Sequence, residues 1–335
     1  MVANLQLLRA QHDELTFVGG EPTLHPNLAA LIASARAAGF SRVGIQTNAR
    51  RLADRQYLQS LVDAGLSDVH VSLHGSEAAV HDYHTGVEGS FTEAMNGLAA
   101  SVSKRLPVVA VSVLARSNFR SLSGLPTLLK ARGVQAWLVE VPWVAGRARD
   151  AFDRVVPRLG LALPFALHAL STAAKVSLPS FVRGAPHCLL GPFAARALPS
   201  EPRAYGAACE ACAAKPRCPG VDPAYLERFG GDELRAVAVA VPVAVTVTVA
   251  GEGAAVVASA GDSLTRMFVG VGERARPPLQ DPVRPRMSLP QVGRAAERAQ
   301  PARAEVSTAS PKRSGDALRE ILPGLFDPEK REQEK

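Results

Sequence analysis

Residues 14–23, Glu14-Leu-Thr-Phe-Val-Gly-Gly-Glu-Pro-Thr23, combine the first strand signal of the chain with a glycine-rich turn. Its first five residues are mostly apolar or β-branched, which is typical of a β-strand, and Gly19-Gly20 ends them. A helical pattern follows over residues 27–38, and Gly39 is placed to end that helix. The order of strand, turn and helix predicts one βα unit.

The same order recurs through the first half of the chain. The sequence predicts further strands over residues 42–46, 68–73, 108–114 and 135–141, and helices over residues 54–64, 91–103 and 122–131. Gly65 and Gly133 end two of these helices as Gly39 ends the first. Such regular alternation indicates right-handed βαβ connections and a parallel sheet, and therefore an α/β fold. A barrel and an open sheet both satisfy this pattern.

Polar residues gather where the expected strands end. They are Gly19, Gly20 and Glu21 after the first, Thr47 and Asn48 after the second, Ser72 and His74 at the third, and Arg116 and Asn118 after the fourth. Because parallel strands end at one edge of a sheet, we expect these residues to share one site.

Composition favours a globular protein. The chain has 335 residues, of which 47% are hydrophobic and 21% charged. The longest apolar stretch, residues 236–250, contains Pro242 and is shorter than the roughly 20 residues that span a bilayer. No basic and apolar leader pattern follows Met1. We therefore expect a cytoplasmic protein without a membrane partner.

The net charge of +7 raises the question of nucleic-acid binding. Residues 274–313 hold nine Arg or Lys and only three acids, which is nearly all of the excess, together with many prolines and few large apolar residues. Such a segment cannot bury enough surface to offset its chain entropy, so it is interpreted as a disordered basic linker. This interpretation disfavours a nucleic-acid partner.

All four cysteines lie between residues 188 and 218, at Cys188, Cys209, Cys212 and Cys218. A Cys-x-x-Cys pair lets two thiolates reach one metal or cluster, and two further thiolates complete four ligands. Spacing alone does not choose between zinc and iron–sulfur. A cytoplasmic setting disfavours disulfides.

Three histidines, His74, His81 and His84, also lie close together in sequence. They raise the hypothesis of a second metal site. We interpret them as polar loop histidines.

Four stretches, Phe17–Leu24, Ile45–Asn48, Val71–Gly75 and Cys209–Cys212, resemble the radical S-adenosylmethionine (radical SAM) superfamily. The resemblance covers roughly residues 5–235. It implies a partial (βα)6 TIM-like barrel that lacks its first strand in this chain.

The resemblance also implies a set of SAM contacts. Gly19, Gly20 and Glu21 would contact the methionyl amino group, and Ser72 would contact the ribose. Arg116 and Asn118 would lie near the SAM carboxylate and ribose, and Thr47, Asn48 and His74 would line the pocket. No residue is assigned a catalytic role.

One departure from the family is large. The family's first βα loop carries Cys-x3-Cys-x2-Cys, which holds the 4Fe–4S cluster that binds SAM, and no cysteine precedes Cys188 here. Either the start codon is assigned too late or the gene is truncated, or the family's chemistry has been lost; the first explanation is favoured. In both cases we expect this chain, as given, not to cleave SAM reductively.

The spacing Cys209-x2-Cys212-x5-Cys218 resembles the SPASM/twitch auxiliary cluster segment of the family. Asp222 stands where the fuller pattern has a cysteine, so Cys188 is the expected fourth ligand. This resemblance favours an auxiliary 4Fe–4S cluster with a structural or electron-relay role, and zinc stays the alternative.

The resulting functional hypothesis is a radical SAM protein. Its intact form would generate a 5′-deoxyadenosyl radical, take electrons from a donor such as ferredoxin or flavodoxin, and modify an unknown substrate for which a peptide is one candidate. The alternative is a non-catalytic βα scaffold with a zinc-binding knuckle of four cysteines, which would act as a binding module.

We expect five segments along the chain. They are a radical SAM core (1–175), a Cys-rich segment (176–231), a small β-rich segment (232–272), the basic linker (273–313), and a short helix with a tail (314–335).

Overall fold

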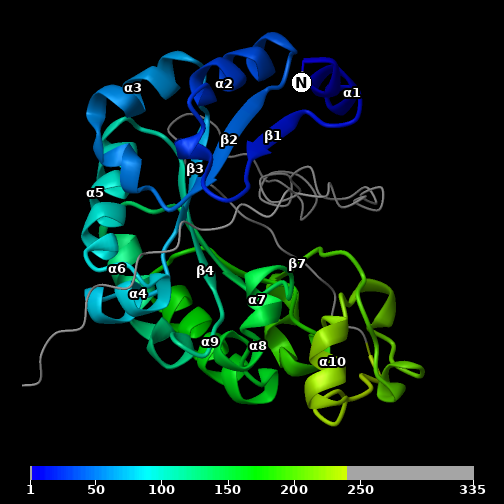
Figure 1. Ribbon diagram of the computed structural model, residues 1–335. Helices are drawn as coiled ribbons and strands as arrows, with labels where there is room; N and C mark the ends of the chain where they lie inside the picture. The colour runs from blue at the N-terminus through cyan, green and yellow to red at the C-terminus, as the bar shows by residue number, and fades with distance from the viewer. Residues whose placement is uncertain (1, 240–335) are drawn as a thin grey trace, which may run out of the picture. The chain divides into compact units, whose positions relative to one another are not determined.

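The computed structural model describes residues 2–239, which Figure 1 draws in colour. Nearly all of the expected β-rich segment, the basic linker and the C-terminal helix therefore lie outside the described residues. The expected boundary at residue 175 stays a prediction.

A seven-stranded sheet organises the described residues. Every neighbouring pair of strands is parallel and the strands follow chain order. The strands are β1 Glu14–Phe17, β2 Arg42–Thr47, β3 Asp68–Ser72, β4 Val108–Val113, β5 Ala136–Glu140, β6 Ser180–Arg183 and β7 Ala197–Leu198. The sheet curls into a half-barrel (Figure 1), so the prediction of a partial barrel of the α/β class is confirmed.

Helices connect the strands and cover one face of the sheet. They are α1 Val2–Arg9, α2 Leu28–Ala37, α3 Arg55–Asp63, α4 Ala78–Thr85, α5 Ser90–Ser103, α6 Leu125–Ala131, α7 Arg147–Asp150, α8 Phe152–Val155, α9 Leu159–Lys175 and α10 Pro223–Phe229. Ile32, Leu58 and Leu98 of these helices are fully buried in one core with Ile45 and Val71 of the strands. Burial of each such aliphatic side chain contributes about 1.5–3 kcal/mol, so this core holds the helices against the sheet.

The opposite face carries a second, smaller apolar cluster built from strand residues alone. Strand register places Ser72, Val111, Leu138 and Phe181 in one row across β3 to β6. A side chain on this face points away from the helix-packed core because successive strand residues alternate between faces. Ser72, which ends β3, therefore lies on the face that the helices leave open.

The glycines that were expected to end helices do so. Gly39, Gly65 and Gly133 have φ of +96°, +100° and +75°, in the left-handed region that favours glycine. Each directly precedes the approach to a strand, which confirms the βα periodicity that the sequence predicts.

Two strands were not expected from the sequence. β6 has four residues between Pro179 and Gly184, and β7 has two, so neither is long enough to display a period. The parallel sheet thus continues beyond residue 175 and reaches the Cys-rich segment.

One stretch, Phe152–Lys175, is long and apolar enough by length and composition to cross a membrane. It comprises α8 and α9, and α9 contains Pro164. Leu163, Ala166 and Leu170 of α9 are fully buried in the main core. Burial of these three residues within the fold accounts for part of the apolar character of this stretch.

Candidate functional site

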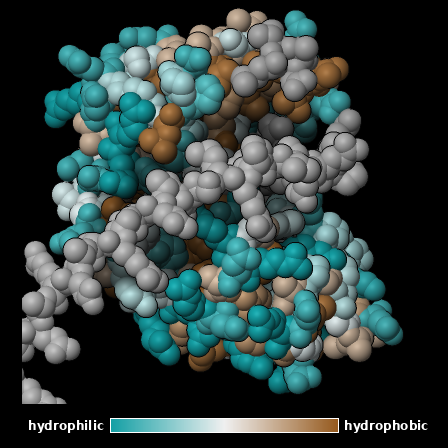
Figure 2. Space-filling model, in the orientation of Figure 1, coloured by the Kyte–Doolittle hydropathy of each residue, from teal (hydrophilic) through white to brown (hydrophobic). Residues whose placement is uncertain are grey.

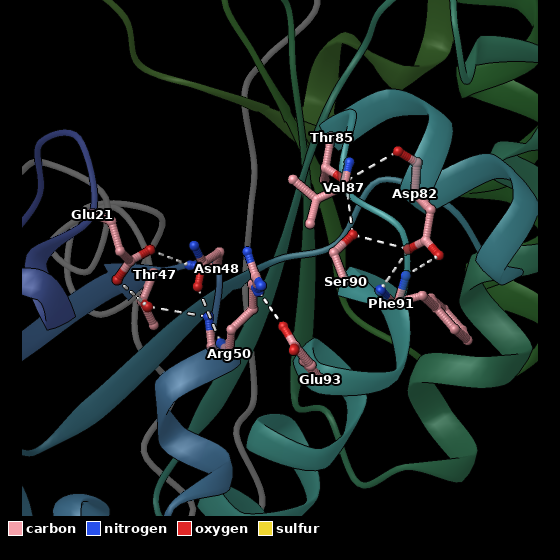
Figure 3. Close-up of polar contacts among 12 residues, drawn as sticks. Glu21, Thr47, Asn48, Arg50, Asp82, Thr85, Val87, Ser90, Phe91 and Glu93 are labelled. Carbon is pink, nitrogen blue, oxygen red and sulfur yellow. Dashed lines mark hydrogen bonds and ion pairs between the residues drawn. The ribbon is translucent and has the colours of Figure 1, made fainter.

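The loop after β1 is tied to the end of β2 by the carboxylate of Glu21 (Figure 3). Its Oε2 accepts a hydrogen bond from the backbone N–H of Asn48 at 2.8 Å, and its Oε1 accepts one from the Thr47 hydroxyl at 2.5 Å. Oε1 also accepts from the backbone N–H and the hydroxyl of Thr23. A carboxylate has about four acceptor positions, so Oε2, with one protein donor, keeps capacity for another donor.

Gly19 and Gly20 present bare backbone beside Glu21. A Cβ atom added to either glycine would meet nothing within 4 Å. Gly19 has φ +143°, which side-chain-bearing residues rarely adopt, whereas Gly20 is free of that constraint. Exposed Val18 and Leu24 flank this loop, and Figure 2 shows hydrophobic surface at the upper right, around α1 and β1. The space beside Gly19 and Gly20 is therefore open, and a ligand can approach their backbone closely.

The ends of β3 and β4 are joined by Asn118. Its side chain is buried at 2% exposure; it donates to the carbonyls of His74 and Val113 and accepts from the backbone N–H of Ala115. Asn118 therefore fixes the loop shapes, and its amide is committed to the protein. The Ser72 hydroxyl has no hydrogen-bond partner within residues 2–239 and stays available to a ligand.

Arg116 and Asn48 are anchored by local contacts. The Arg116 guanidinium donates to the carbonyl of Asp153 in α8. The Asn48 side-chain oxygen accepts from the backbone N–H of Arg50, whose guanidinium pairs with Glu93 of α5 (Figure 3). The ends of β1 and β2 thus bring together Gly19, Gly20, Glu21, Thr47 and Asn48. Ser72, His74 and Asn118 lie at the ends of the adjacent strands β3 and β4. The roles of all these residues toward SAM stay predictions.

His74, His81 and His84 form a stack beside these loops. The rings of His74 and His84 lie 4.0 Å apart between centroids at an interplanar angle of 21°, and those of His74 and His81 lie 5.8 Å apart. Nδ1 of His74 accepts from the backbone N–H of Val113, and Nδ1 of His81 accepts from that of His74. Each of these two neutral rings therefore carries its proton on Nε2, which leaves no lone pair for a metal.

This geometry argues against the hypothesis of a histidine metal site. Within residues 2–239, no group of three His, Cys, Asp or Glu side chains is placed to hold one metal ion. Burial lowers the pKa of His84 to about 4, and it lowers the pKa of His74 well below the ordinary value, with His84 and His81 adding to the shift. The stack is therefore neutral at pH 7.

Because the histidine stack is neutral at pH 7, we expect the folded protein to lose stability in acid. Between about pH 6.5, the ordinary histidine pKa, and pH 4, the unfolded chain binds protons that the folded stack does not, so the free energy of unfolding should fall as pH falls through this window. The pKa values of Asp68 and Asp82 are lowered from 3.8, so these carboxylates titrate below the window. Urea unfolding at several pH values measures the slope.

A matched pair of variants isolates the stack in that experiment. His84→Gln should flatten the slope between pH 6.5 and 4, whereas His168→Gln, at an exposed position of α9, should leave it unchanged. Equal slopes in wild type and His84→Gln would show that the stack is not the cause.

One ion pair at the same edge of the sheet was not predicted from the sequence. Arg183, the last residue of β6, donates from Nε to Oε1 of Glu140, the last residue of β5, at 2.6 Å. Strand register places both on the same face as Ser72. Glu140 lies one residue before the end of the expected strand 135–141, so the strand-end rule could have found it, but β6 carried no detectable signal. The pair adds fixed charges of both signs to the site.

The four cysteines come together although they are up to 30 residues apart. Cys188, Cys209, Cys212 and Cys218 line a single cavity, and all four are free thiols. Burial raises the pKa of the Cys188 thiol, and the three neighbouring cysteines add to that shift.

Backbone amides point at the sulfur atoms of this cavity. Cys218 Sγ accepts from the N–H groups of His187 and Gly220 at 3.4 Å each, and Cys212 Sγ accepts from Val237 at 3.3 Å. Hydrogen bonds to the sulfurs are one of the means by which proteins tune iron–sulfur clusters. The four sulfurs share a cavity but are not arranged around one point for a single ion. Four cysteine donors suit a 4Fe–4S cluster and tetrahedral zinc alike.

Asp222 is not among the residues that line the cysteine cavity. Its Oδ1 accepts from the backbone N–H of Ala224 and so caps α10, while its Oδ2 accepts from that of Val144 at 3.2 Å. Cys188 lines the cavity with the other three cysteines, and its role as the fourth ligand stays a prediction.

Comparison with known families gives one match. Residues 2–117 match the model of the radical SAM superfamily. The matched region contains every strand-end residue described above up to Arg116.

Curated relatives match over similar lengths. The AdoMet-dependent heme synthase of Nitratidesulfovibrio vulgaris is 27% identical over 142 residues, which is 42% of this chain and 38% of the relative. The PqqA peptide cyclase of Rhodopseudomonas palustris is 31% identical over 121 residues, which is 35% of this chain and 31% of the relative. The chain thus spans less than half the length of these relatives.

Two solved structures are also similar. Streptococcus suis SuiB bound to S-adenosylmethionine aligns with a TM-score of 0.46 and 13% identity over 56% of this chain and 44% of that one. A domain of pyruvate-formate lyase-activating enzyme from Bacteroides vulgatus aligns with a TM-score of 0.40 and 14% identity over 50% of this chain and 97% of that one.

Proposed function

We propose that this chain, whose residues 2–117 belong to the radical SAM superfamily, binds SAM at the carboxyl ends of β1 to β4 and holds an auxiliary 4Fe–4S cluster on its four cysteines. The observation that carries the proposal is the open glycine loop beside Glu21, with the hydroxyl of Ser72 free on the uncovered face of the sheet. Together these residues offer acceptors for an ammonium group and space for close backbone approach.

The fit of SAM rests on this chain's own donors and acceptors. The backbone of Gly19 and Gly20 and the free capacity of Glu21 Oε2 suit the methionyl ammonium group, and the Ser72 hydroxyl suits a ribose hydroxyl. Thr47 and Asn118 would position these groups through hydrogen bonds. In an intact form that also held a reduced 4Fe–4S cluster, SAM bound by these residues would supply the 5′-deoxyadenosyl group for hydrogen abstraction from a substrate.

The SAM-binding cluster itself has no ligands within residues 1–335, because no Cys-x3-Cys-x2-Cys motif occurs in them. A polypeptide of these residues should therefore bind SAM weakly and should not cleave it. With dithionite as electron donor, no 5′-deoxyadenosine should form. Its formation in this assay would overturn the expectation of an inactive chain.

The auxiliary site is proposed to be of the SPASM/twitch kind. Four cysteines on one cavity, with N–H donors at two of the sulfurs, support it. We place the protein in the cytoplasm, a reducing compartment that keeps thiols available as ligands, where ferredoxin or flavodoxin would serve as electron donor for an intact form. For the substrate we propose a peptide, since one relative is named a peptide cyclase.

The alternative is a non-catalytic scaffold with zinc on the same cysteines. Anaerobic purification followed by iron, sulfide and zinc analysis separates the two. A brown protein with about four irons and four sulfides per chain, the composition of one such cluster, is expected. A colourless protein with one zinc per chain would show that the cysteines hold zinc instead of an iron–sulfur cluster.

A further inference from the structure

Arg203 connects the cysteine cavity to the open end of the half-barrel. Its backbone N–H donates to the carbonyl of Pro219 at 2.9 Å, and the next residue, Ala204, forms an antiparallel bridge with Val221. This pairing lays Arg203 alongside the chain that follows Cys218. The guanidinium then reaches back and donates through one terminal nitrogen to the carbonyl of Gly184, directly after β6.

The Asp222 carboxylate stabilises the charge of Arg203 electrostatically without forming an ion pair with it. Within residues 2–239 Arg203 forms no ion pair, and its Nε is buried without a hydrogen-bond partner. Both carboxylate oxygens of Asp222 accept backbone N–H groups, so Asp222 offsets the charge of Arg203 without bonding to its guanidinium. A buried N–H without an acceptor is costly, so the Nε–H of Arg203 keeps the capacity to donate one further hydrogen bond.

The electrostatic partners of Arg203 point to the cysteine cavity. Burial lowers the pKa of Arg203, whereas the charges of Asp222 and Cys218 oppose that shift. Two cations line the cavity itself, Lys215 and Arg235, but both are exposed to solvent and therefore screened. Of these three cations, Arg203 is the one whose field is weakened least by water.

We propose that Arg203 raises the reduction potential of the iron–sulfur cluster held by Cys188, Cys209, Cys212 and Cys218. The proposal rests on the cluster assigned under the proposed function. An electron taken up by the cluster adds negative charge, and a nearby buried cation with a free N–H donor stabilises that charge. Because Arg203 also bonds to the chain just after β6, it would couple the charge state of the cluster to the mouth of the half-barrel.

Redox titration followed by electron paramagnetic resonance tests this proposal. Arg203→Gln and Arg203→Met remove the charge, and either variant that keeps the wild-type iron content should be harder to reduce. At the wild-type midpoint its oxidised-to-reduced ratio should rise at least tenfold, which corresponds to about 59 mV for a one-electron couple. Arg203→Lys should recover at least half of that shift.

Arg217→Gln is the matched control, because it removes an equal charge from an exposed residue next to Cys218 and should leave the midpoint ratio within about a factor of two of wild type. A wild-type midpoint in a neutral Arg203 variant that still holds its cluster would refute the proposal, as would equal midpoints for the Lys and neutral variants. A wild-type protein without iron would instead refute the proposed function.

Discussion

Gly20→Val should reduce SAM affinity at least tenfold, about 1.4 kcal/mol, while the protein stays folded. A Cβ at Gly20 meets no atom within 4 Å, and Gly20 does not have the positive φ of Gly19, so the protein itself tolerates a side chain there. The same open space is where the methionyl group of SAM is proposed to lie. Equilibrium dialysis with labelled SAM measures the affinity, and thermal unfolding measures the fold.

Gly231 provides the control for this substitution. It too lacks a positive φ, and a Cβ added to it has only ordinary contacts, the nearest at 3.7 Å, in the Cys-rich segment. Gly231→Ala should leave SAM affinity unchanged, whereas Gly20→Ala should weaken it less than Gly20→Val does. Unchanged SAM affinity in a folded Gly20→Val protein would show that the glycine loop is not part of the SAM site.

Cys212→Ser should remove most of the iron from the anaerobically purified protein. Cys212 supplies one of the four thiolates of the cavity, and its sulfur accepts the N–H of Val237, so a hydroxyl there is a poor ligand and disturbs the loop. Iron content should fall to a small fraction of the wild-type value, with loss of the brown colour. Iron and sulfide assays measure this change directly.

Ala213→Ser tests whether the effect belongs to the thiolate. Ala213 is the exposed neighbour of Cys212, and a hydroxyl added there should leave the iron content at the wild-type value. Full iron loading of Cys212→Ser would exclude Cys212 as a ligand.

The sequence was most informative where elements are long and periodic. The strand from Asp68 and the helix that ends at Ser103 could be predicted because five or more residues repeat a pattern between turn signals. The polar residues that follow such strands were found by the same logic, since parallel strands end at one edge.

The contacts that complete the site could not be predicted. β6 has only four residues and shows no periodic pattern. The sequence therefore did not indicate that Arg183 pairs with Glu140. Likewise, nothing in the residues around Arg203 indicates that Ala204 pairs with Val221, because that pairing depends on tertiary contacts between loops.

Co-crystallisation of residues 1–335 with SAM tests the central claim most directly. We expect SAM at the carboxyl ends of β1 to β4, with its amino group against Gly19, Gly20 and Glu21 and its ribose beside Ser72. SAM bound on another surface, or a glycine loop that stays empty in crystals saturated with SAM, would contradict it.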